Sequence, residues 1–309
     1  MELVWLEDFL ALVECGHFSR AAEKRHITQP AFSRRVRTLE DWVGAQLFDR
    51  DTHRVELTAA GEVFKPMAEE VTRRIYLGRE QTRAAATGSA ATIRFASTHA
   101  LSMVFFPHFL SRIEEQDHLE STVSLVTNNM TGCEAVMQHG EAHFLLCHRH
   151  KSAATSLRPD QFLSLVVGHD VLMPLSIPDA ETGKPLYALP GSVTEPVQHL
   201  AYSATSGMGR ILAATQALDM PPNWRASVFA SHVATVLAAM TRSGRGMAWL
   251  PRSLVVGDLE SGALVRAGPE AFDVPIQICI VRPRARQSPA AEKFWASVKR
   301  TGWDMEAQS

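Results

Sequence analysis

The chain has 309 residues with a formal net charge of −2, and 46% of them are hydrophobic. This length gives room for two or three domains with sizeable cores, and the near-zero charge excludes a wholly basic nucleic-acid coat protein, so that any nucleic-acid contact must come from a local patch. No apolar run reaches the roughly 18–20 residues of a membrane span, and the opening MELVWLEDFL carries no basic leader. We therefore expect a cytoplasmic protein without membrane contact.

Two helices are predicted first. The first covers residues 3–15, where apolar residues recur at three- and four-residue spacing, and Gly16 ends it. The second starts the stretch 18–40, FSRAAEKRHITQPAFSRRVRTLE. Ser19 can cap this helix, which runs to about Arg25, because its hydroxyl can accept a free N–H of the first turn. His26 and the next residue are expected to form a tight turn.

A third helix follows the turn. Thr28 is expected to cap it, and Pro30 lies in its first turn, where the missing N–H costs nothing. One face is apolar and should meet a core: Phe32, Val36 and Leu39. The opposite face is polar: Gln29, Ser33, Arg34 and Arg37. A helix-turn-helix places such a face in the DNA major groove.

The local charge supports this interpretation. Between Phe18 and Thr38 there are six bases and a single acid, Glu23, which gives a local net charge of +5 in a chain of net charge −2. The six bases are Arg20, Lys24, Arg25, Arg34, Arg35 and Arg37. Phosphate contacts supply much of the affinity for DNA. The alternative is a solvated amphipathic helix pair, and the charge taken alone would favour that alternative. The charge, the cap of the third helix and the small alanines of the second helix together favour DNA binding.

A small two-stranded wing is predicted next, over residues 48–58. The core should continue to it through Trp42, Val43, Leu47 and Phe48. The residues 51–53 supply the turn of the wing, and Arg50 and Arg54 flank it. Arginine at a wing can contact phosphate or the minor groove. A bare hairpin with solvated arginines is the alternative, and these two residues alone do not decide.

One long helix then runs from Thr58, its expected cap, to about Thr87. Its apolar stripe consists of Val63, Phe64, Met67, Val71 and Ile75. A second copy of the chain is the natural partner for such a stripe, since twofold pairing is the commonest oligomer symmetry. In the alternative the stripe packs on its own chain.

The small residues 88–91 predict a hinge, and the pattern changes beyond it. Strands alternate with helices, which predicts an α/β fold with a largely parallel sheet. The expected strands are 92–97, 121–127, 143–148, 163–167, 171–174, 226–230, 246–250 and 276–281. The expected helices are 101–114, 133–139, 208–218, 233–243 and 289–300.

The run 9–64, with FLALVECGHFSRAAEKRHITQPAFSRRVRTLE and then LFDRDTHRVELTAAGEVF, resembles the N-terminal domain of LysR-type transcriptional regulators. TQPAFSRR, YSATSGMGR and GRGMAWLP are most similar to the hypochlorite-responsive type. The resemblance implies a winged helix-turn-helix, a long dimerisation helix and a two-lobed effector domain like periplasmic solute-binding proteins. The implied divisions are 1–58 for DNA binding, 59–87 for the linker helix, 88–91 for the hinge, 92–164 with 268–303 for lobe I, and 165–267 for lobe II.

Ligands of open α/β sheets lie beyond the carboxyl ends of strands, near helix N-termini that suit an anion. Polar groups follow predicted strands at three places, and we expect effector contacts there, with plain helix capping as the alternative. These candidates are Ser97, Thr98 and His99; Ser203, Thr205, Ser206 and Met208; and, more weakly, Asn128 and His232, with Asn129 and His148 weaker still.

No sequence pattern indicates an enzyme, because GxGxxG, GxSxG and P-loop motifs are absent. The four cysteines are scattered without a CxxC pair, so we expect buried thiols and neither a metal site nor a cofactor. An oxidant sensor switched by oxidation of Met208 remains an alternative function, since a sulfoxide would turn this side chain polar. A solute-binding module or enzyme is a more remote one.

The sequence thus predicts a homodimeric or tetrameric DNA-binding regulator, controlled by a small anionic or zwitterionic effector. Its expected partners are double-stranded promoter DNA, the effector, further copies of itself and, if it activates, RNA polymerase. The DNA contacts are expected from Arg20, Gln29, Pro30, Ser33, Arg34, Arg37, Arg50 and Arg54.

Overall fold

The computed structural model of the chain describes residues 1–49, 55–87, 92–117, 121–216 and 224–303. The chain divides into two compact units, Met1–Ser89 with Gln138–Glu141, and Ala90–Met137 with Ala142–Ser309. Among the helices of the described residues, none has both the length and the apolar character needed to cross a membrane.

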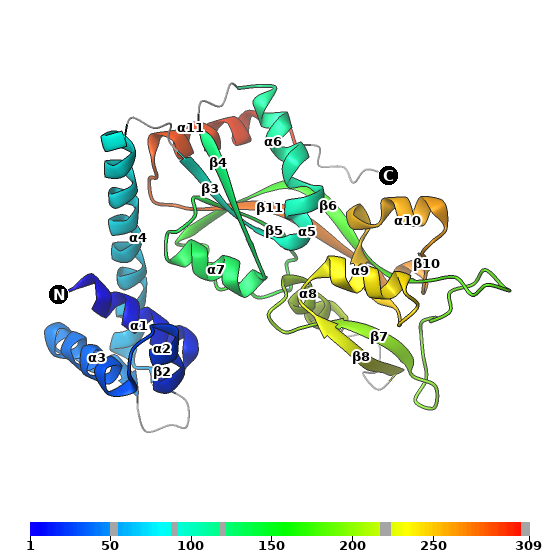
Figure 1. The fold of residues 1–309 in the computed structure, drawn as a ribbon, viewed down its shortest axis with the longest axis horizontal. Helices are drawn as coiled ribbons and strands as arrows, with labels where there is room; N and C mark the ends of the chain where they lie inside the picture. The colour runs from blue at the N-terminus through cyan, green and yellow to red at the C-terminus, as the bar shows by residue number, and fades with distance from the viewer. Residues whose placement is uncertain (50–54, 88–91, 118–120, 217–223, 304–309) are drawn as a thin grey trace. The chain divides into compact units, whose positions relative to one another are not determined.

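The first unit consists of helices and one small hairpin, drawn in blue to cyan in Figure 1. Its elements are α1 (Leu3–Cys15), α2 (Phe18–Lys24), α3 (Gln29–Val43), β1 (Phe48–Asp49), β2 (Glu56–Leu57) and α4 (Ala59–Thr87). The pairing of Phe48 with Leu57 and of Asp49 with Glu56 is antiparallel, which confirms the predicted wing.

The core of this unit forms where the apolar stripes of its helices meet. Phe9 of α1 and Phe32, Val36 and Leu39 of α3 are all fully buried, as the helical spacing predicted. Trp42 was expected in this core, and that prediction is wrong, because its side chain is 56% exposed. Trp42 follows Leu39 by three residues, but it lies to one side of the buried row that Phe32, Val36 and Leu39 form along α3.

The ends of the helices confirm some of the predicted stops and caps and contradict others. Gly16 ends α1 with a left-handed φ of 65°, and His26 turns the chain after α2 with a φ of 53°. Ser19 does not cap α2, because the helix begins at Phe18 and its N-cap is His17. Thr28 is the N-cap of α3 without a side-chain cap bond, whereas Thr58 Oγ1 accepts from the N–H of Gly61 at 3.1 Å.

The apolar stripe of α4 divides between two faces. Phe64 and Val71 pack against the core of the first unit. Val63, Met67 and Ile75 are 73%, 60% and 44% exposed. The predicted stripe therefore serves the chain's own core in part, and leaves a narrower apolar row on the outer face of the helix.

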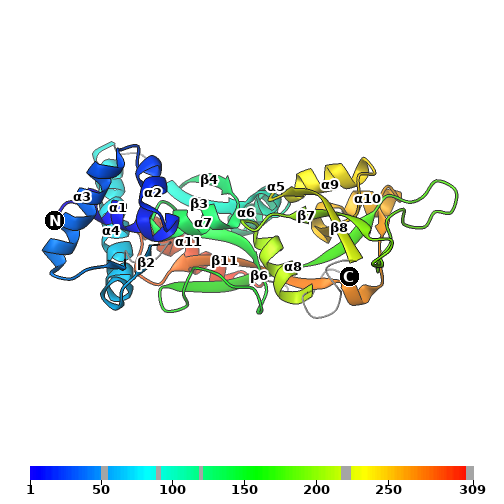
Figure 2. The ribbon, with the colours of Figure 1, turned by 90° about the horizontal axis from the view of Figure 1, so that it is seen from below.

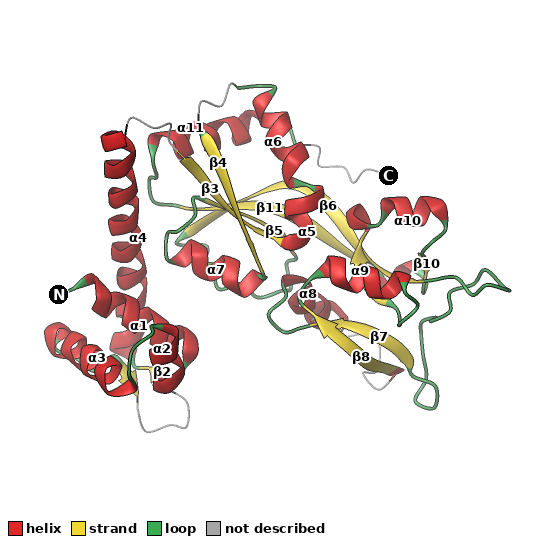
Figure 3. Ribbon diagram, in the orientation of Figure 1, coloured by secondary structure: helices red, strands yellow, loops and turns green. Residues whose placement is uncertain are grey.

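The second unit contains a seven-stranded sheet and a two-stranded one, shown in yellow in Figure 3. The large sheet has the order β10–β6–β11–β5–β3–β4, with β9 paired to β6, and the small sheet pairs β7 with β8. The strands are β3 (Thr92–Thr98), β4 (Thr122–Asn128), β5 (Phe144–Arg149), β6 (Phe162–Ser176), β7 (Val197–Tyr202), β8 (Arg225–Ser231), β9 (Ala248–Pro251), β10 (Val265–Arg266) and β11 (Val274–Pro283).

The large sheet is mixed. β3 pairs in parallel with β4 and β5, and β7 pairs in parallel with β8. β11 pairs antiparallel with β5 and β6, and β6 pairs antiparallel with β9 and β10. The expectation of a largely parallel sheet is therefore wrong for the large sheet, because β11 inserts between β5 and β6 in the opposite direction.

Helices cover both faces of this sheet. They are α5 (His99–Val104), α6 (Phe106–Glu114), α7 (Met130–Gln138), α8 (Gly207–Gln216), α9 (Ala234–Arg242), α10 (Val256–Ser261) and α11 (Pro289–Arg300), with short turns at Arg252–Leu254 and Glu270–Phe272. Along β5, Phe144 and Leu146 share a core with α6 and α11, while Leu145 and Cys147 share one with α7. This alternation is the two-residue period of a strand covered on both faces.

β6 and β11 connect two cores of the second unit. Val167 and Ile278 pack in the core of α6 and α11, whereas Leu172 and Ile276 pack with α8 and Trp249. β11 pairs over its full length with the first part of β6, Phe162–Leu172, and Figure 2 shows both strands passing from the part that holds α7 and α11 to the part that holds α9 and α10. The sequence had predicted two strands, 163–167 and 171–174, where the structure has one.

Candidate functional site

The exposed face of α3 carries the polar side chains that the sequence predicted there. Gln29, Pro30, Arg34 and Arg37 are exposed, and Ser33 is half-buried beside the buried Phe32. Pro30 lies in the first turn of the helix, and the N-cap Thr28 makes no side-chain capping bond there. The helix thus presents its N-terminal part and its arginines to solvent.

The six bases around the turn divide into two groups. Lys24 pairs with Glu14, Arg25 with Glu7 and Asp8, and Arg35 with Asp8. The exposed Arg20, Arg34 and Arg37 form no ion pair with any residue that the structure describes. The sequence count of +5 therefore overstates the charge free to meet phosphate, and these three arginines carry what remains.

Asp8 ties α1 to the helix pair. Its carboxylate is fully buried, and it accepts from Arg25 Nε at 2.8 Å and from Arg35 Nη1 at 3.3 Å. Burial alone would lower the pKa of Arg25, but its hydrogen bonds to Asp8 and Glu7 outweigh burial and raise the pKa. Arg25 and Arg35 therefore stabilise the packing of α1 against the helix pair. Arg50 and Arg54, the predicted wing contacts, lie outside the described residues.

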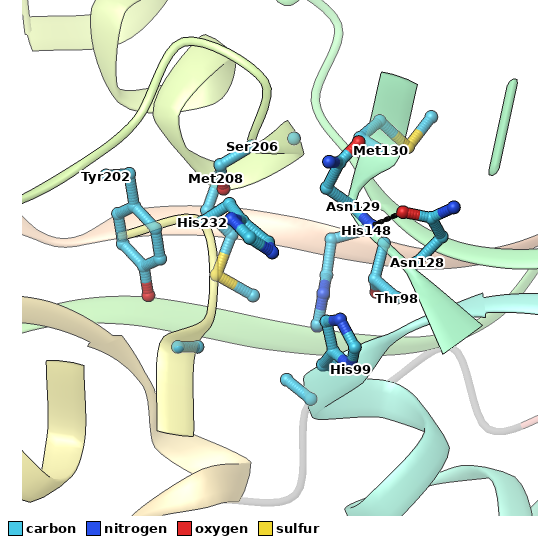
Figure 4. Close-up of a pocket in the computed structure, with 13 residues that line it drawn as sticks. Thr98, His99, Asn128, Asn129, Met130, His148, Tyr202, Ser206, Met208 and His232 are labelled. Atoms are coloured by element: carbon cyan, nitrogen blue, oxygen red, sulfur yellow. Dashed lines mark hydrogen bonds between the residues drawn. The ribbon is translucent and has the colours of Figure 1, made fainter. Parts of the chain in front are cut away.

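A pocket that is open to solvent lies in the second unit where strands end and helices begin. Its lining comes from the ends of β3, β4, β5 and β7 and from the first residues of α5, α7, α8 and α9. Figure 4 shows these side chains, which are Thr98, His99, Ala100, Asn128, Asn129, Met130, His148, Tyr202, Ser206, Gly207, Met208, His232 and Ala234.

The pocket brings together six of the nine predicted effector contacts. Thr98, His99, Asn128, Ser206, Met208 and His232 line it, whereas Ser97, Ser203 and Thr205 do not. Ser97 is fully buried, and its hydroxyl donates to the carbonyl of Thr98. Ser203 and Thr205 share a hydrogen bond of 3.2 Å with each other, beside the pocket.

Sequence reasoning gave little or no weight to several lining residues. Asn129 and His148 had a signal, since both follow predicted strands. Tyr202 ends β7, a strand that the sequence did not predict. Met130 and Ala234 open their helices without any chemical signature in the sequence.

The capping alternative holds for some of these residues only. Ser206 Oγ accepts from Gly209 N at 3.4 Å, a long cap bond at the start of α8, and Asn129 Oδ1 accepts from Gly132 N at 2.9 Å at the start of α7. Thr98 is the N-cap of α5 but its side chain makes no capping bond, and the Ser97 hydroxyl donates to the Thr98 carbonyl instead. Thr98 Oγ1 is instead buried without a hydrogen-bond partner among the described residues.

Two further lining groups are buried with unused hydrogen-bonding capacity. Both ring nitrogens of His148 and the hydroxyl of Tyr202 lack a hydrogen-bond partner in the described part of the chain. Burial, and next the nearby Asp170, raise the pKa of the Tyr202 phenol, so it stays a neutral donor. Buried polar atoms are normally paired, so such groups in a pocket are available to a ligand or to water.

Together, a helix-turn-helix with exposed arginines and an α/β unit with a polar pocket at its helix starts define an effector-controlled DNA-binding regulator. The chain belongs to the LysR family. Residues 3–62 match the family described as bacterial regulatory helix-turn-helix proteins of the lysR family, and residues 86–303 match the LysR substrate binding domain.

Individual relatives agree over nearly the whole chain. The regulator YjiE of Escherichia coli K12 is 27% identical over 97% of this chain and 94% of its own. Vibrio fischeri DarR, solved in complex with DNA, is 30% identical with a TM-score of 0.55, covering 97% and 99% of the two chains. HypT of Salmonella typhimurium, a hypochlorite-specific LysR-type regulator, is 27% identical with a TM-score of 0.57, covering 97% and 98%.

Proposed function

We propose that this LysR-type regulator reads promoter DNA with the exposed face of α3 and responds to a small anionic or zwitterionic effector held in the pocket of the second unit. The observation that carries the effector site is the convergence of strand ends and helix starts on one pocket whose buried Thr98, His148 and Tyr202 have unused hydrogen-bonding atoms. Its site of action is the cytoplasm, where promoter DNA lies.

For DNA, the proposal assigns the major groove to Gln29, Ser33, Arg34 and Arg37, with Pro30 at the start of the helix. Arg34 and Arg37 are exposed and form no ion pair with any described residue, which leaves their guanidinium groups free for base edges or phosphates. Arg20 contacts the DNA backbone from α2. Arg50 and Arg54 complete the set at the wing, on the strength of the family resemblance alone.

For assembly, we assign the outer row of α4, Val63, Met67 and Ile75, to pairing with a second copy. A row of exposed apolar side chains on a long helix favours an interface. A dimer places two α3 helices on two half-sites of one promoter. Higher assembly to a tetramer, and contact with RNA polymerase at activated promoters, extend the same proposal.

The chain is divided by function in the same proposal. Residues 1–58 bind DNA, 59–87 pair, 88–91 form the hinge, 92–164 with 268–303 form lobe I, and 165–267 form lobe II. The passage of β6 and β11 between two cores supports this division of the second unit. Effector binding between lobes would then change their relative position and, through it, the spacing of the half-sites.

The DNA assignment is tested with duplexes selected from random sequence by the full chain. Arg34→Ala and Arg37→Ala are each expected to weaken binding by about 1–3 kcal/mol, with an altered base preference where the side chain reads a base. Arg158→Ala in the second unit is the matched control, since Arg158 is also exposed. Equal affinities for all three variants and the wild type would refute the assignment.

A further inference from the structure

For a site proposed to bind an anion, the pocket is unusual in the ionisable side chains of its lining. Three histidines line it, His99, His148 and His232, and among its described lining residues there is no lysine, arginine, aspartate or glutamate. Imidazole is the side chain whose charge changes near neutral pH. Any positive side-chain charge in the lining must therefore come from a protonated histidine.

His148 is the most constrained of the three. Its side chain is 3% exposed at the end of β5, and neither ring nitrogen makes a hydrogen bond within the described structure. Its Nε2 lies 3.6 Å from Oδ2 of Asp170, beyond hydrogen-bond distance. Either ring nitrogen is therefore available for a hydrogen bond with a group bound in the pocket.

Asp170 is held as a carboxylate by other partners. Its Oδ1 accepts from Val171 N at 2.8 Å and Ser253 N at 3.2 Å, and its Oδ2 accepts from the Ser253 hydroxyl at 2.5 Å. Burial raises the pKa of Asp170, but the pKa is lowered on balance by His148, by Ser253 and by the Val171 N–H.

His99 and His232 face each other across the pocket. Their ring centroids are 6.0 Å apart, with His99 at the start of α5 and His232 after β8. Figure 4 shows the three imidazole rings turned toward the middle of the pocket. Two cations this close repel each other, so protonating both is unfavourable until an anion lies between them.

The charged side chains of α7 and α8, beside the pocket, are paired with each other. Glu134 of α7 and Arg210 of α8 pair with each other at 2.8 Å, and the Tyr202 phenol is kept neutral by its raised pKa. The N-termini of α7, α8 and α9 add a preference for negative charge through their helix dipoles. The apolar part of the lining comes from Ala100, Met130, Met208 and Ala234, while Thr98, Asn128, Asn129 and Ser206 add uncharged polar groups.

From this arrangement we infer that the effector is a small organic carboxylate with an apolar body, and that its binding takes up at least one proton on the cluster His99, His148 and His232. The inference rests on the proposed role of the pocket. Anion and proton then bind cooperatively, so that the carboxylate binds more tightly as the pH falls. For one proton taken up, affinity rises by up to about tenfold per pH unit.

Isothermal titration calorimetry of the full chain tests this with matched probes, butyrate and benzoate against the neutral butyramide and benzamide. Titrations at pH 6 and pH 8, each in two buffers of different ionisation enthalpy, give the affinity and the number of protons taken up. We expect tighter carboxylate binding at pH 6, net proton uptake and no binding of the amides. His148→Asn should reduce the proton uptake, and His108→Asn, an exposed histidine of α6, should not.

Several outcomes would overturn the inference: pH-independent binding, equal binding of amide and carboxylate, unchanged uptake in His148→Asn, His99→Asn and His232→Asn, or no carboxylate binding at either pH. Its failure is distinguishable from failure of the proposed function by footprinting selected duplexes. A neutral compound that shifts the footprint would refute the carboxylate and keep the effector role. A carboxylate that binds with proton uptake but leaves the footprint unchanged would support the carboxylate inference and refute the effector role.

Discussion

Arg210 of α8 and Glu134 of α7 join the two helices beside the pocket, with Nη1 of the arginine 2.8 Å from Oε2 of the glutamate. Arg210 Nη2 also donates to Thr131 Oγ1 at 2.5 Å, and Glu134 Oε1 accepts from Thr155 Oγ1 and Ser156 N. Since both helices begin with residues of the pocket lining, this pair connects the two sides of the site.

Arg210→Ala is expected to lower the thermal stability of the second unit and to weaken effector binding. Glu134 is 3% exposed, so losing its cationic partner leaves a buried charge with two hydrogen bonds, at a cost of about 1–3 kcal/mol. Differential scanning calorimetry measures the change. Arg242→Ala, which breaks an arginine pair with Asp258 that is 43% exposed on the arginine side, should cost less than about 1 kcal/mol. Equal losses would show that the α7–α8 pair has no special role.

Asp8→Ala is expected to destabilise the first unit by about 1–3 kcal/mol, because the buried acceptor of Arg25 and Arg35 is lost while both arginines can regain water. Urea unfolding followed by circular dichroism gives the value. Glu14→Ala serves as the control, since its pair with Lys24 is exposed on both sides. If the two variants behave alike, Asp8 does not anchor the helix pair.

Glu292 predicts an acid-sensitive step in the second unit. Its carboxylate accepts from Arg282 Nη1 at 2.9 Å and Nη2 at 2.7 Å, and hydrogen bonding to this arginine lowers the pKa of Glu292 to about 2. A free glutamate ionises near pH about 4.3. Because the folded pKa is the lower one, the stabilisation is complete above that pH and is lost as the pH falls toward 2.

Thermal unfolding between pH 2.5 and 6 checks this expectation. The wild type should lose stability on acidification, and Glu292→Gln should start less stable and lose less over the same range. Asp160→Asn, at an exposed pair with Arg158, should follow the wild type. Parallel pH profiles for wild type and Glu292→Gln would contradict the assignment.

Met208 distinguishes the ligand-responsive regulator from an oxidant sensor. Its side chain is 6% exposed and lines the pocket. If it only packs against the effector, Met208→Leu keeps the apolar volume and changes effector affinity by less than about 1.5 kcal/mol. Hypochlorite should then change promoter affinity equally in wild type and variant, by anisotropy with a selected duplex. A response in the wild type alone would establish the methionine switch.

The sequence predicted the first unit closely because its signals are local. Helix Leu3–Cys15 follows from the spacing of its apolar residues and from Gly16, and the turn at His26 and the cap at Thr58 follow from the residues directly beside them. The predictions for Trp42 and Ser19 were wrong. The hydrophobicity of Trp42 does not fix which face of the helix it occupies, and the capping chemistry of Ser19 does not fix at which residue the helix begins. The ion pairs of Arg25 and Arg35 with Asp8 span seventeen and twenty-seven residues and leave no local trace.

In the second unit, prediction failed where contacts are distant. The sequence predicted separate strands at 163–167 and 171–174, yet β6 continues through Gly168, where a Cβ would lie 3.1 Å from the ring of Phe105. Pairing with β11 holds the strand extended on either side. Tyr202 ends a strand that the sequence did not predict, so that only the fold places it in the pocket, whereas His148 had the weak signal of following a predicted strand.

The most direct test of the account is DNase I footprinting of selected duplexes by the full chain, with and without carboxylate at a concentration that saturates the pocket. The account predicts that the carboxylate changes the length or the hypersensitive sites of the footprint for the wild type, and that His148→Asn requires a higher concentration for the same change. An unchanged wild-type footprint at saturation would contradict the claim that pocket occupancy controls DNA recognition.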